Sequence, residues 1–303
     1  MVATHPTLTR LLCTFEAGLG RLRAFSSNHR GAFTVLGVGL FAAGLGWALM
    51  HAPSQLWQDL KPTPWLFYLL GLAACSLLAS AKSLQVSAQM VQSDVRDGAS
   101  LVYVSTANLL ELLPLPGGAL TRAIAIRQGG ASITNSGMAI LLSAGLTLAL
   151  TLVICGLALV ALQHTIGWAV LVTGLAASGA ITFGIARMSR GSIAAKAVLI
   201  RLVLFAFSVL RLYCALQLLG EAASLVGAAL MSVAITAGTA ISLVPAGMGV
   251  SELLAGGFAT LTETAPALAI LAVAANRVMT LVTSGIVCLI AGGTLRGKQE
   301  VRS

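Results

Sequence analysis

The sequence contains few charged residues. Asp, Glu, Lys and Arg occupy 9% of its 303 positions, whereas hydrophobic residues occupy 57%. A soluble domain of this length needs much more polar surface, so the composition excludes a soluble protein and indicates an all-α polytopic membrane protein. The formal net charge is +9, but the basic residues lie mainly in short segments beside apolar runs. This placement favours membrane topology over binding of nucleic acid.

Motifs for metal binding and catalysis are also missing. The five cysteines form no CxxC pair, and the four histidines form no HExxH or similar cluster, so no metal site is predicted. The sequence has no GxxxxGK[ST] loop, no strand-borne GxGxxG, no GxSxG and no Ser/His/Asp set. We therefore expect no cofactor, no catalytic residues and no enzymatic activity.

Six apolar runs are long enough to cross a membrane as helices, for which about 20 residues suffice. They predict full transmembrane helices at about 32–50, 65–81, 137–162, 166–186, 197–219 and 267–293. Two other apolar regions, 101–130 and 222–262, contain Pro and Gly and do not fit as single spans. Before the first run, residues 7–25 have an apolar face and a charged face, which predicts an amphipathic helix at the membrane surface.

The connecting segments differ in charge. Most Lys and Arg lie in alternate segments, whereas Asp59, Glu221 and Glu263 lie in the others. The positive-inside rule therefore places both termini in the cytoplasm. Both ends of 101–130 are then cytoplasmic and both ends of 222–262 are external, which predicts two re-entrant helical hairpins that enter from opposite sides. A full two-span hairpin stays open for 222–262.

The two hairpins contain similar motifs, LPLPGGALTR (113–122) and LVPAGMGVSE (243–252). Pro245 lies 131 residues after Pro114, and the spans around each motif recur at nearly the same offset. The order span, span, broken hairpin, span thus occurs twice in opposite orientation, which predicts an inverted repeat of the kind found in transporters. The predicted organisation is a cytoplasmic arm, a first repeat, a second repeat and a cytoplasmic tail, at 1–31, 32–163, 164–293 and 294–303.

The hairpin tips, marked by Pro114, Pro116 and Pro245, are the predicted substrate site. Backbone that leaves the helix inside a bilayer requires a cavity or surrounding protein, and a half-helix that starts there directs its positive dipole end into the cavity. An anionic headgroup suits such a pair of tips. The candidate substrate-binding residues lie at the tips or inside apolar runs: Asn108, Glu111, Gly117, Gly118, Arg122, Arg211, Gly247, Gly249, Glu252 and Arg277.

Two roles stay open for the charged candidates, because a charge inside a membrane needs either a partner or a polar cavity. Arg211 and Arg277 either form structural ion pairs with Glu252 or Glu111 or contact a phosphate. Arg122 is either an anchor at the cytoplasmic interface or a ligand contact.

Other residues in the runs have structural interpretations. Arg201, near the start of a run, is expected to extend to the cytoplasmic interface. Asn108 and Asn276 are also candidates for hydrogen bonds between helices. Six glycines of the runs at 32–50 and 166–186 are expected to allow close helix contact: Gly37, Gly39, Gly44, Gly46, Gly179 and Gly184.

Three segments carry a resemblance to a known family. They are NLLELLPLPGGALTRAIAIRQGG (108–130), LVPAGMGVSELLAGGFATL (243–261) and ANRVMTLVTSG (275–285). In these segments the chain resembles the lysylphosphatidylglycerol synthase transmembrane-region family, also called flippase-like domain proteins. The family pattern has a Pro/Gly turn followed by an Arg, which matches this chain at Arg122. Its later Pro-x-Gly-x-Gly-x-x-Glu stretch matches at Glu252, and its downstream Arg matches at Arg277. Family members often have a Glu-Arg pair and an acid after the first motif, whereas this chain reads GMAILLSAGLTLAL there.

The resemblance implies a lipid translocase of the bacterial cytoplasmic membrane, without the aminoacyl transferase domain of the larger family members. The expected substrate is an anionic or aminoacylated phospholipid or a polyprenyl-phosphate-linked headgroup. Two alternatives stay open: a secondary transporter of a small anion, and a membrane enzyme or accessory subunit that acts on lipid phosphates. The expected partners are membrane lipids, and a homo-oligomer is left open.

Overall fold

The computed structural model describes residues 30–51, 64–111, 117–240, 247 and 249–300, and the side chains at 30–38, 40, 41 and 292–300 lie outside this description. The described part folds into helices joined by turns, without strands. The helices are α2 (Arg30–His51), α4 (Pro64–Gln89), α5 (Asp97–Leu110), α6 (Gly117–Gln128), α7 (Ile133–Ala161), α8 (Ile166–Met188), α9 (Gly191–Leu218), α10 (Leu225–Ala240), α11 (Val250–Ala259) and α12 (Pro266–Glu300).

Five described helices are long and apolar enough to cross a membrane. They are α4, α7, α8, α9 and the part of α12 from Pro266 to Ala291, and they confirm a multi-pass membrane protein. A helix suits these runs because hydrocarbon offers no partner for backbone N–H and C=O groups, and a helix pairs them internally. The predicted first span, 32–50, is helical in α2, but its side chains at 32–38, 40 and 41 lie outside the described residues. The predicted amphipathic helix at 7–25 lies outside them entirely.

Two pairs of short helices replace single spans at the predicted hairpins. The first helix pair is α5 and α6, with 14 and 12 residues, and the second helix pair is α10 and α11, with 16 and 10 residues. At 1.5 Å per residue these helices are about 15–24 Å long, which is less than the hydrocarbon core of about 30 Å. The order long, long, short pair, long therefore occurs twice along the described chain.

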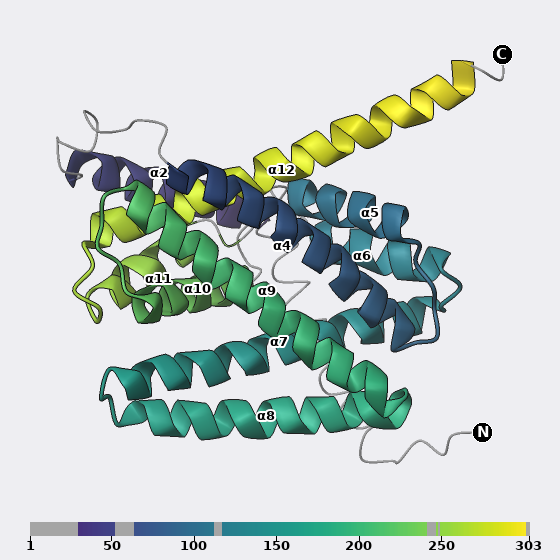
Figure 1. Ribbon diagram of the computed structural model, residues 1–303, viewed down its shortest axis with the longest axis horizontal. Helices are drawn as coiled ribbons and strands as arrows, with labels where there is room; N and C mark the ends of the chain where they lie inside the picture. The colour runs from purple at the N-terminus through teal and green to yellow at the C-terminus, as the bar shows by residue number, and fades with distance from the viewer. Residues whose placement is uncertain (1–29, 52–63, 112–116, 241–246, 248, 301–303) are drawn as a thin grey trace.

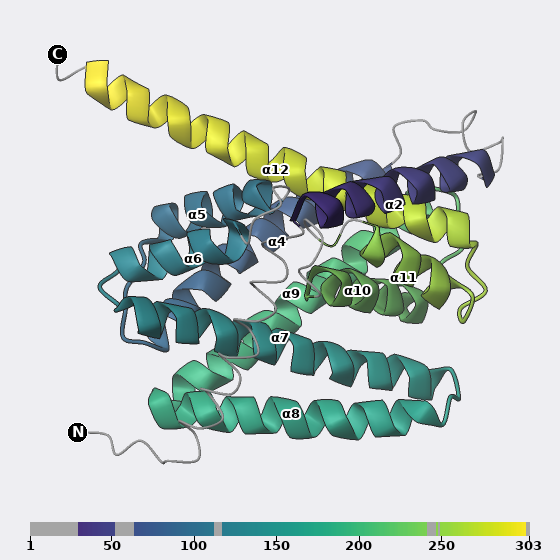
Figure 2. The same cartoon turned by 180° about the vertical axis from the view of Figure 1, so that it is seen from behind.

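The long helices α4 and α9 pack against each other through the middle of the molecule, and the two helix pairs lie on opposite sides of them (Figures 1 and 2). The first helix pair shares a buried apolar cluster with α4 that includes Leu84, Val104 and Ile126. The second shares another with α9 and α12 that includes Leu212 and Met231. Each helix pair thus has its own apolar core.

Glycines produce the close contact between α7 and α8, which lie side by side (Figures 1 and 2). A Cβ atom added at Gly156, Gly167 or Gly174 would come within 2.5–2.7 Å of backbone nitrogen on the opposite helix. This is the small-residue packing expected between membrane helices. The glycines that were predicted to make close helix contacts do not make them, because an added Cβ at Gly179 or Gly184 would meet nothing within 4 Å. The same holds for Gly39, Gly44 and Gly46, and Gly37 lies outside the described side chains.

Candidate functional site

The first helix pair presents an acid–arginine ion pair where α5 ends and α6 begins. Glu111 follows the last residue of α5, and its Oε1 lies 2.9 Å from Nη2 of Arg122 in α6. Both side chains are about one-third exposed, at 35% and 34%. The Glu111 side chain passes over Gly118, where an added Cβ would come within 2.5 Å of its Cγ. Gly118 therefore provides the space in which this ion pair forms, whereas Pro114 and Pro116 lie outside the described residues.

In the second helix pair, the segment between α10 and α11 contacts α10 through the backbone of glycine residues. Gly247 has φ +65° and Gly249 has φ +81°, in the left-handed region that favours glycine. An added Cβ at Gly247 would lie 2.4 Å from the carbonyl carbon of Gly238, and one at Gly238 would lie 2.8 Å from the backbone nitrogen of Ser251. The chain between α10 and α11 thus packs against α10 through backbone. Pro245 lies outside the described residues.

Glu252 occupies the first turn of α11 and is almost completely buried. Its Oε2 accepts a hydrogen bond from the Gly249 N–H at 2.8 Å, and its negative charge suits the positive end of the helix dipole. Its Oε1 lies 3.2 Å from Nη2 of Arg277 on α12, and the two side chains are 2% and 14% exposed. The structure therefore contains the ion pair that the sequence left as one of two roles for Arg277.

Ser251 joins this buried ion pair, although the sequence analysis did not select it. Its Oγ accepts a hydrogen bond from Nη2 of Arg277 at 2.7 Å. The same hydroxyl can donate to Gly247 O at 3.0 Å or to Oε2 of Glu252 at 2.9 Å, one at a time. Ser251 thus connects the arginine, the acid and the glycine turn. Its position beside Glu252 in the motif is the signal that could have identified it.

Helix α12 connects the two helix pairs. Arg277 contacts the start of α11, and seven residues later the Ser284 hydroxyl accepts a hydrogen bond from the Asn108 side-chain amide of α5 at 3.1 Å. The Asn108 side-chain oxygen in turn accepts a hydrogen bond from the Arg122 guanidinium at 3.4 Å. Residues seven apart lie on the same face of a helix. Helix α12 thus contacts both polar groups, Asn108 with Arg122 and Glu111 in the first helix pair and Ser251 with Glu252 in the second.

Arg211 is buried at 7% exposure between α9 and α12, and no carboxylate lies within ion-pair distance of it among the described residues. Its guanidinium donates to the side-chain oxygen of Asn276 at 2.7 Å, to the backbone oxygen of Asn276 at 3.2 Å and to the Thr280 hydroxyl. The ion pair considered for Arg211 is therefore not present. Asn276 makes the predicted type of hydrogen bond between helices, and its partner is this arginine.

Arg201 differs from the expectation that it extends to the interface. Its side chain is buried, with 6% of the residue exposed. It donates to the backbone oxygen of Ser143 and to the hydroxyl of Thr147 on α7, each at 3.1 Å. Because these two oxygens of α7 lie within hydrogen-bond distance, the guanidinium makes its hydrogen bonds within the protein instead of at the headgroup layer.

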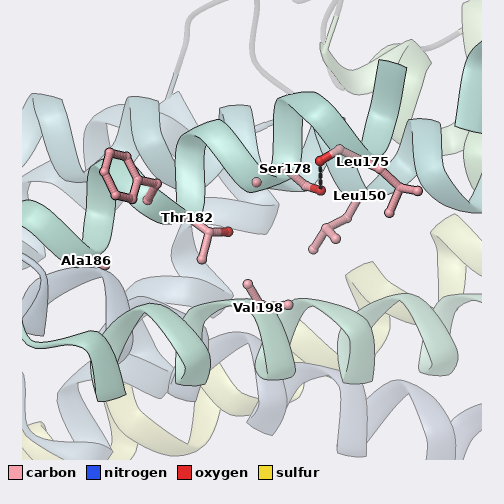
Figure 3. Close-up of a pocket in the computed structure, with 8 residues that line it drawn as sticks. Leu150, Leu175, Ser178, Thr182, Ala186 and Val198 are labelled. Carbon is pink, nitrogen blue, oxygen red and sulfur yellow. Dashed lines mark hydrogen bonds between the residues drawn. The ribbon is translucent and has the colours of Figure 1, made fainter. Parts of the chain in front are cut away.

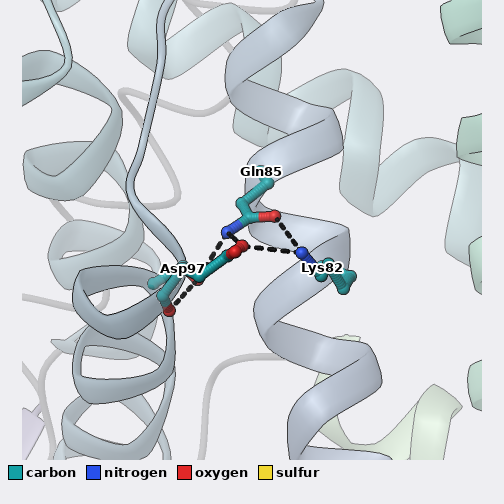
Figure 4. A network of polar contacts seen from close by, with 4 residues as sticks. Lys82, Gln85 and Asp97 are labelled. Atoms are coloured by element: carbon teal, nitrogen blue, oxygen red, sulfur yellow. Dashed lines mark hydrogen bonds and ion pairs between the residues drawn. The ribbon is translucent and has the colours of Figure 1, made fainter.

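A second polar network lies where α4 approaches the start of α5 (Figure 4). Asp97 accepts hydrogen bonds from Lys82 and Gln85, each at 2.6 Å, and a groove of about 410 Å³ lies beside it. The Lys82 and Gln85 hydrogen bonds, together with the Lys82 charge, hold the pKa of the exposed Asp97 below its ordinary value. This groove does not include the charged residues of the two helix pairs.

No protein-family model, curated protein or solved structure matches this chain. No group of three or more His, Cys, Asp or Glu residues in the described part of the chain could hold a metal ion.

Proposed function

We propose that the protein is a lipid translocase that moves a phosphate-bearing headgroup across a bacterial cytoplasmic membrane while the acyl chains stay in the bilayer. The observation that carries the proposal is the pair of broken helix hairpins whose ends hold charged side chains and share contacts with α12. The resemblance of the hairpin motifs to the flippase-like domain family supports the same function, and membership in that family is part of the proposal.

Helix length supports the re-entrant arrangement. Each helix of the two helix pairs is too short to cross the hydrocarbon core, so the ends of α5 and α10 would lie within it. Backbone groups freed there need water, ligand or protein. In the proposal the two helix pairs enter from opposite sides, as an inverted repeat with both termini in the cytoplasm, and their ends meet near the membrane centre.

Charge supports an anionic headgroup. Arg122 and Arg277 are paired with the carboxylates of Glu111 and Glu252. Arg211, which donates to Asn276 beside Arg277, adds one positive charge that no described carboxylate pairs with. The N-terminal ends of α6 and α11 add partial positive charge. Arg122 is the side chain best placed to contact a headgroup, because it is one-third exposed and its partner Glu111 is exposed to the same extent.

The proposal is tested with purified protein in phosphatidylcholine vesicles that contain a trace of fluorescent phosphatidylglycerol or fluorescent phosphatidylcholine. Dithionite added outside bleaches the outer leaflet, and translocation exposes the inner leaflet. We expect fast bleaching of phosphatidylglycerol by the wild type, and at least about a tenfold slower rate for Arg122→Gln, because a hydrogen bond to a charged group contributes about 1.5–3 kcal/mol.

Arg127→Gln is the matched control, because Arg127 lies on the same helix, is exposed and makes no ion pair among the described residues. Bleaching of each fluorescent lipid no faster than in empty vesicles would overturn the proposal. Uptake of radiolabelled phosphate into the vesicles, without lipid movement, would establish the small-anion transporter instead. Chemical conversion of the added lipid would establish an enzyme.

A further inference from the structure

A groove of about 510 Å³ lies between α7, α8 and α9, on residues that take no part in the contacts of the two helix pairs. In Figure 3 residues of α8 face Val198 of α9 across the open space. Its walls are apolar or carry small hydroxyl groups, and they include Leu150, Leu175, Gly179, Thr182, Ala186 and Val198. Because α7, α8 and α9 are each apolar enough to span a membrane, a groove between them would open toward lipid.

The length of the groove corresponds to one leaflet. Along α8 it extends from Leu175 to Ala186, a separation of eleven residue steps, or about 16 Å of helix. Half of the hydrocarbon core is about 15 Å thick. The groove ends two residues before Met188, the last residue of α8. It therefore covers the acyl-chain depth of the leaflet next to the turn between α8 and α9.

Basic residues lie near that end of the groove in the chain. The guanidinium of Arg187, the residue after Ala186, lies 4.5 Å from the centre of the Phe183 ring, which also lines the groove. Arg190 and Lys196 are exposed in and beside the same turn. The sequence has no Asp or Glu between Glu111 and Glu221, so α7, α8 and α9 supply no acid to neutralise these residues.

Arg201 adds a further positive charge behind the groove. It lies three residues after Val198, and its acceptor Thr147 lies three residues before Leu150, so both are one helical turn from groove residues. Its described hydrogen-bond acceptors are neutral oxygens. A guanidinium whose charge is not cancelled raises the positive potential of the groove wall.

We infer that this groove binds an acyl chain of an anionic phospholipid whose phosphate lies among Arg187, Arg190 and Lys196. The positive end favours an anionic lipid over a zwitterionic one, since each basic residue near an anionic lipid surface contributes attraction. A second copy of the chain fits less well. A two-fold symmetric contact through this face would bring like charges together, and its helices provide no acid to pair with them.

The inference is tested by photo-crosslinking, which measures binding without transport. Purified protein in detergent is mixed with a phospholipid that carries a diazirine on one acyl chain and a phosphoglycerol or a phosphocholine headgroup, and the labelled peptides are identified by mass spectrometry. We expect the phosphoglycerol lipid to label α8 and α9 at the groove. The variant Arg187→Gln/Arg190→Gln/Lys196→Gln should lose at least about fivefold of this labelling, the effect expected for removing a single basic residue.

Gly179 and Gly184 provide a matched pair of variants. An added Cβ at either glycine meets nothing within 4 Å, but only Gly179 lines the groove. Gly179→Leu should fill the groove and abolish labelling there, whereas Gly184→Leu should leave it unchanged. Equal labelling by both headgroups that the triple variant does not alter would overturn the inference. A disulfide between two copies through Ser178→Cys, with no lipid labelling at the groove, would show instead that a second copy occupies it. Loss of translocation alone would not affect the result, because no step of this assay depends on it.

Discussion

The two helix pairs have the same order of parts but differ in how their ends are held. In the first helix pair, the Glu111–Arg122 ion pair is one-third exposed, and the Glu111 side chain passes over Gly118. In the second, Glu252 is buried and is bound to the Gly249 N–H, the Ser251 hydroxyl and Arg277. An ion pair buried in a low dielectric is held strongly, whereas an exposed pair exchanges readily with water or ligand. We therefore expect the first helix pair to exchange partners and the second to act as a fixed support.

The largest expected difference in stability between the two helix pairs comes from removing the acid of each ion pair. Glu252→Gln leaves the Arg277 guanidinium buried beside a neutral amide, and breaking a buried pair in this way costs about 3–5 kcal/mol. Glu111→Gln breaks a partly exposed pair, and the cost there is about 0–1 kcal/mol. Thermal unfolding of both variants in detergent, followed by circular dichroism, measures the difference.

A double variant separates charge from packing at the buried pair. Glu252→Gln combined with Arg277→Met removes both charges, and we expect it to be more stable than Glu252→Gln alone because no uncompensated charge is left. Equal unfolding temperatures for Glu252→Gln and Glu111→Gln would contradict the assignment of the second helix pair as the fixed support.

The sequence predicted where the helices break and which charged residues lie near the breaks, because both depend on local features. Pro and Gly within an apolar run signal a break, and a charge in such a run requires a partner. The breaks fall between Glu111 and Gly117 and between Ala240 and Val250, where these signals lie. The partners of the charges were less predictable. Arg211 bonds to Asn276, 65 residues away, and that contact depends on how α9 and α12 pack.

The sequence also did not predict which glycines contact a neighbouring helix. Gly179 and Gly184 resemble Gly167 and Gly174 in the sequence, yet only the latter two approach α7 closely. Which face of α8 meets α7 depends on the rotation of the whole helix, and hydrophobicity does not reveal it because α8 is apolar over most of its surface. Ser284 was missed for a similar reason, although its spacing of seven from Arg277 could have indicated a shared face.

Replacing Gly247 or Gly118 with alanine should produce the second largest difference in stability between the two helix pairs. Gly247→Ala introduces a side chain at φ +65°, which costs about 1–2 kcal/mol by itself, and places a Cβ 2.4 Å from the backbone of Gly238. The three atoms nearest to a Cβ added at Gly118 all belong to the flexible Glu111 side chain, which can move. We expect Gly247→Ala to lower the unfolding temperature clearly and Gly118→Ala to leave it nearly unchanged.

The Gly118→Ala variant should nevertheless slow lipid translocation, because the added methyl group displaces Glu111 from Arg122. The vesicle assay with fluorescent phosphatidylglycerol checks this. If Gly118→Ala unfolds at a much lower temperature than the wild type, the first helix pair is as rigid as the second and the comparison fails.

The smallest expected effect concerns the ion pair that ties the first helix pair to α4. The folded protein holds the pKa of Asp97 below its ordinary value of about 3.9, through hydrogen bonds from Lys82 and Gln85 and the Lys82 charge. The stability from this contact is therefore present at neutral pH and is lost only as pH falls below about 4, through the lowered pKa. Asp97→Asn should unfold slightly earlier than the wild type at pH 7, and the difference should disappear in acid and shrink in high salt. Asp94→Asn is the control, because Asp94 makes no ion pair among the described residues. A difference between Asp97→Asn and the wild type that persists in acid would show that packing, rather than charge, joins α5 to α4.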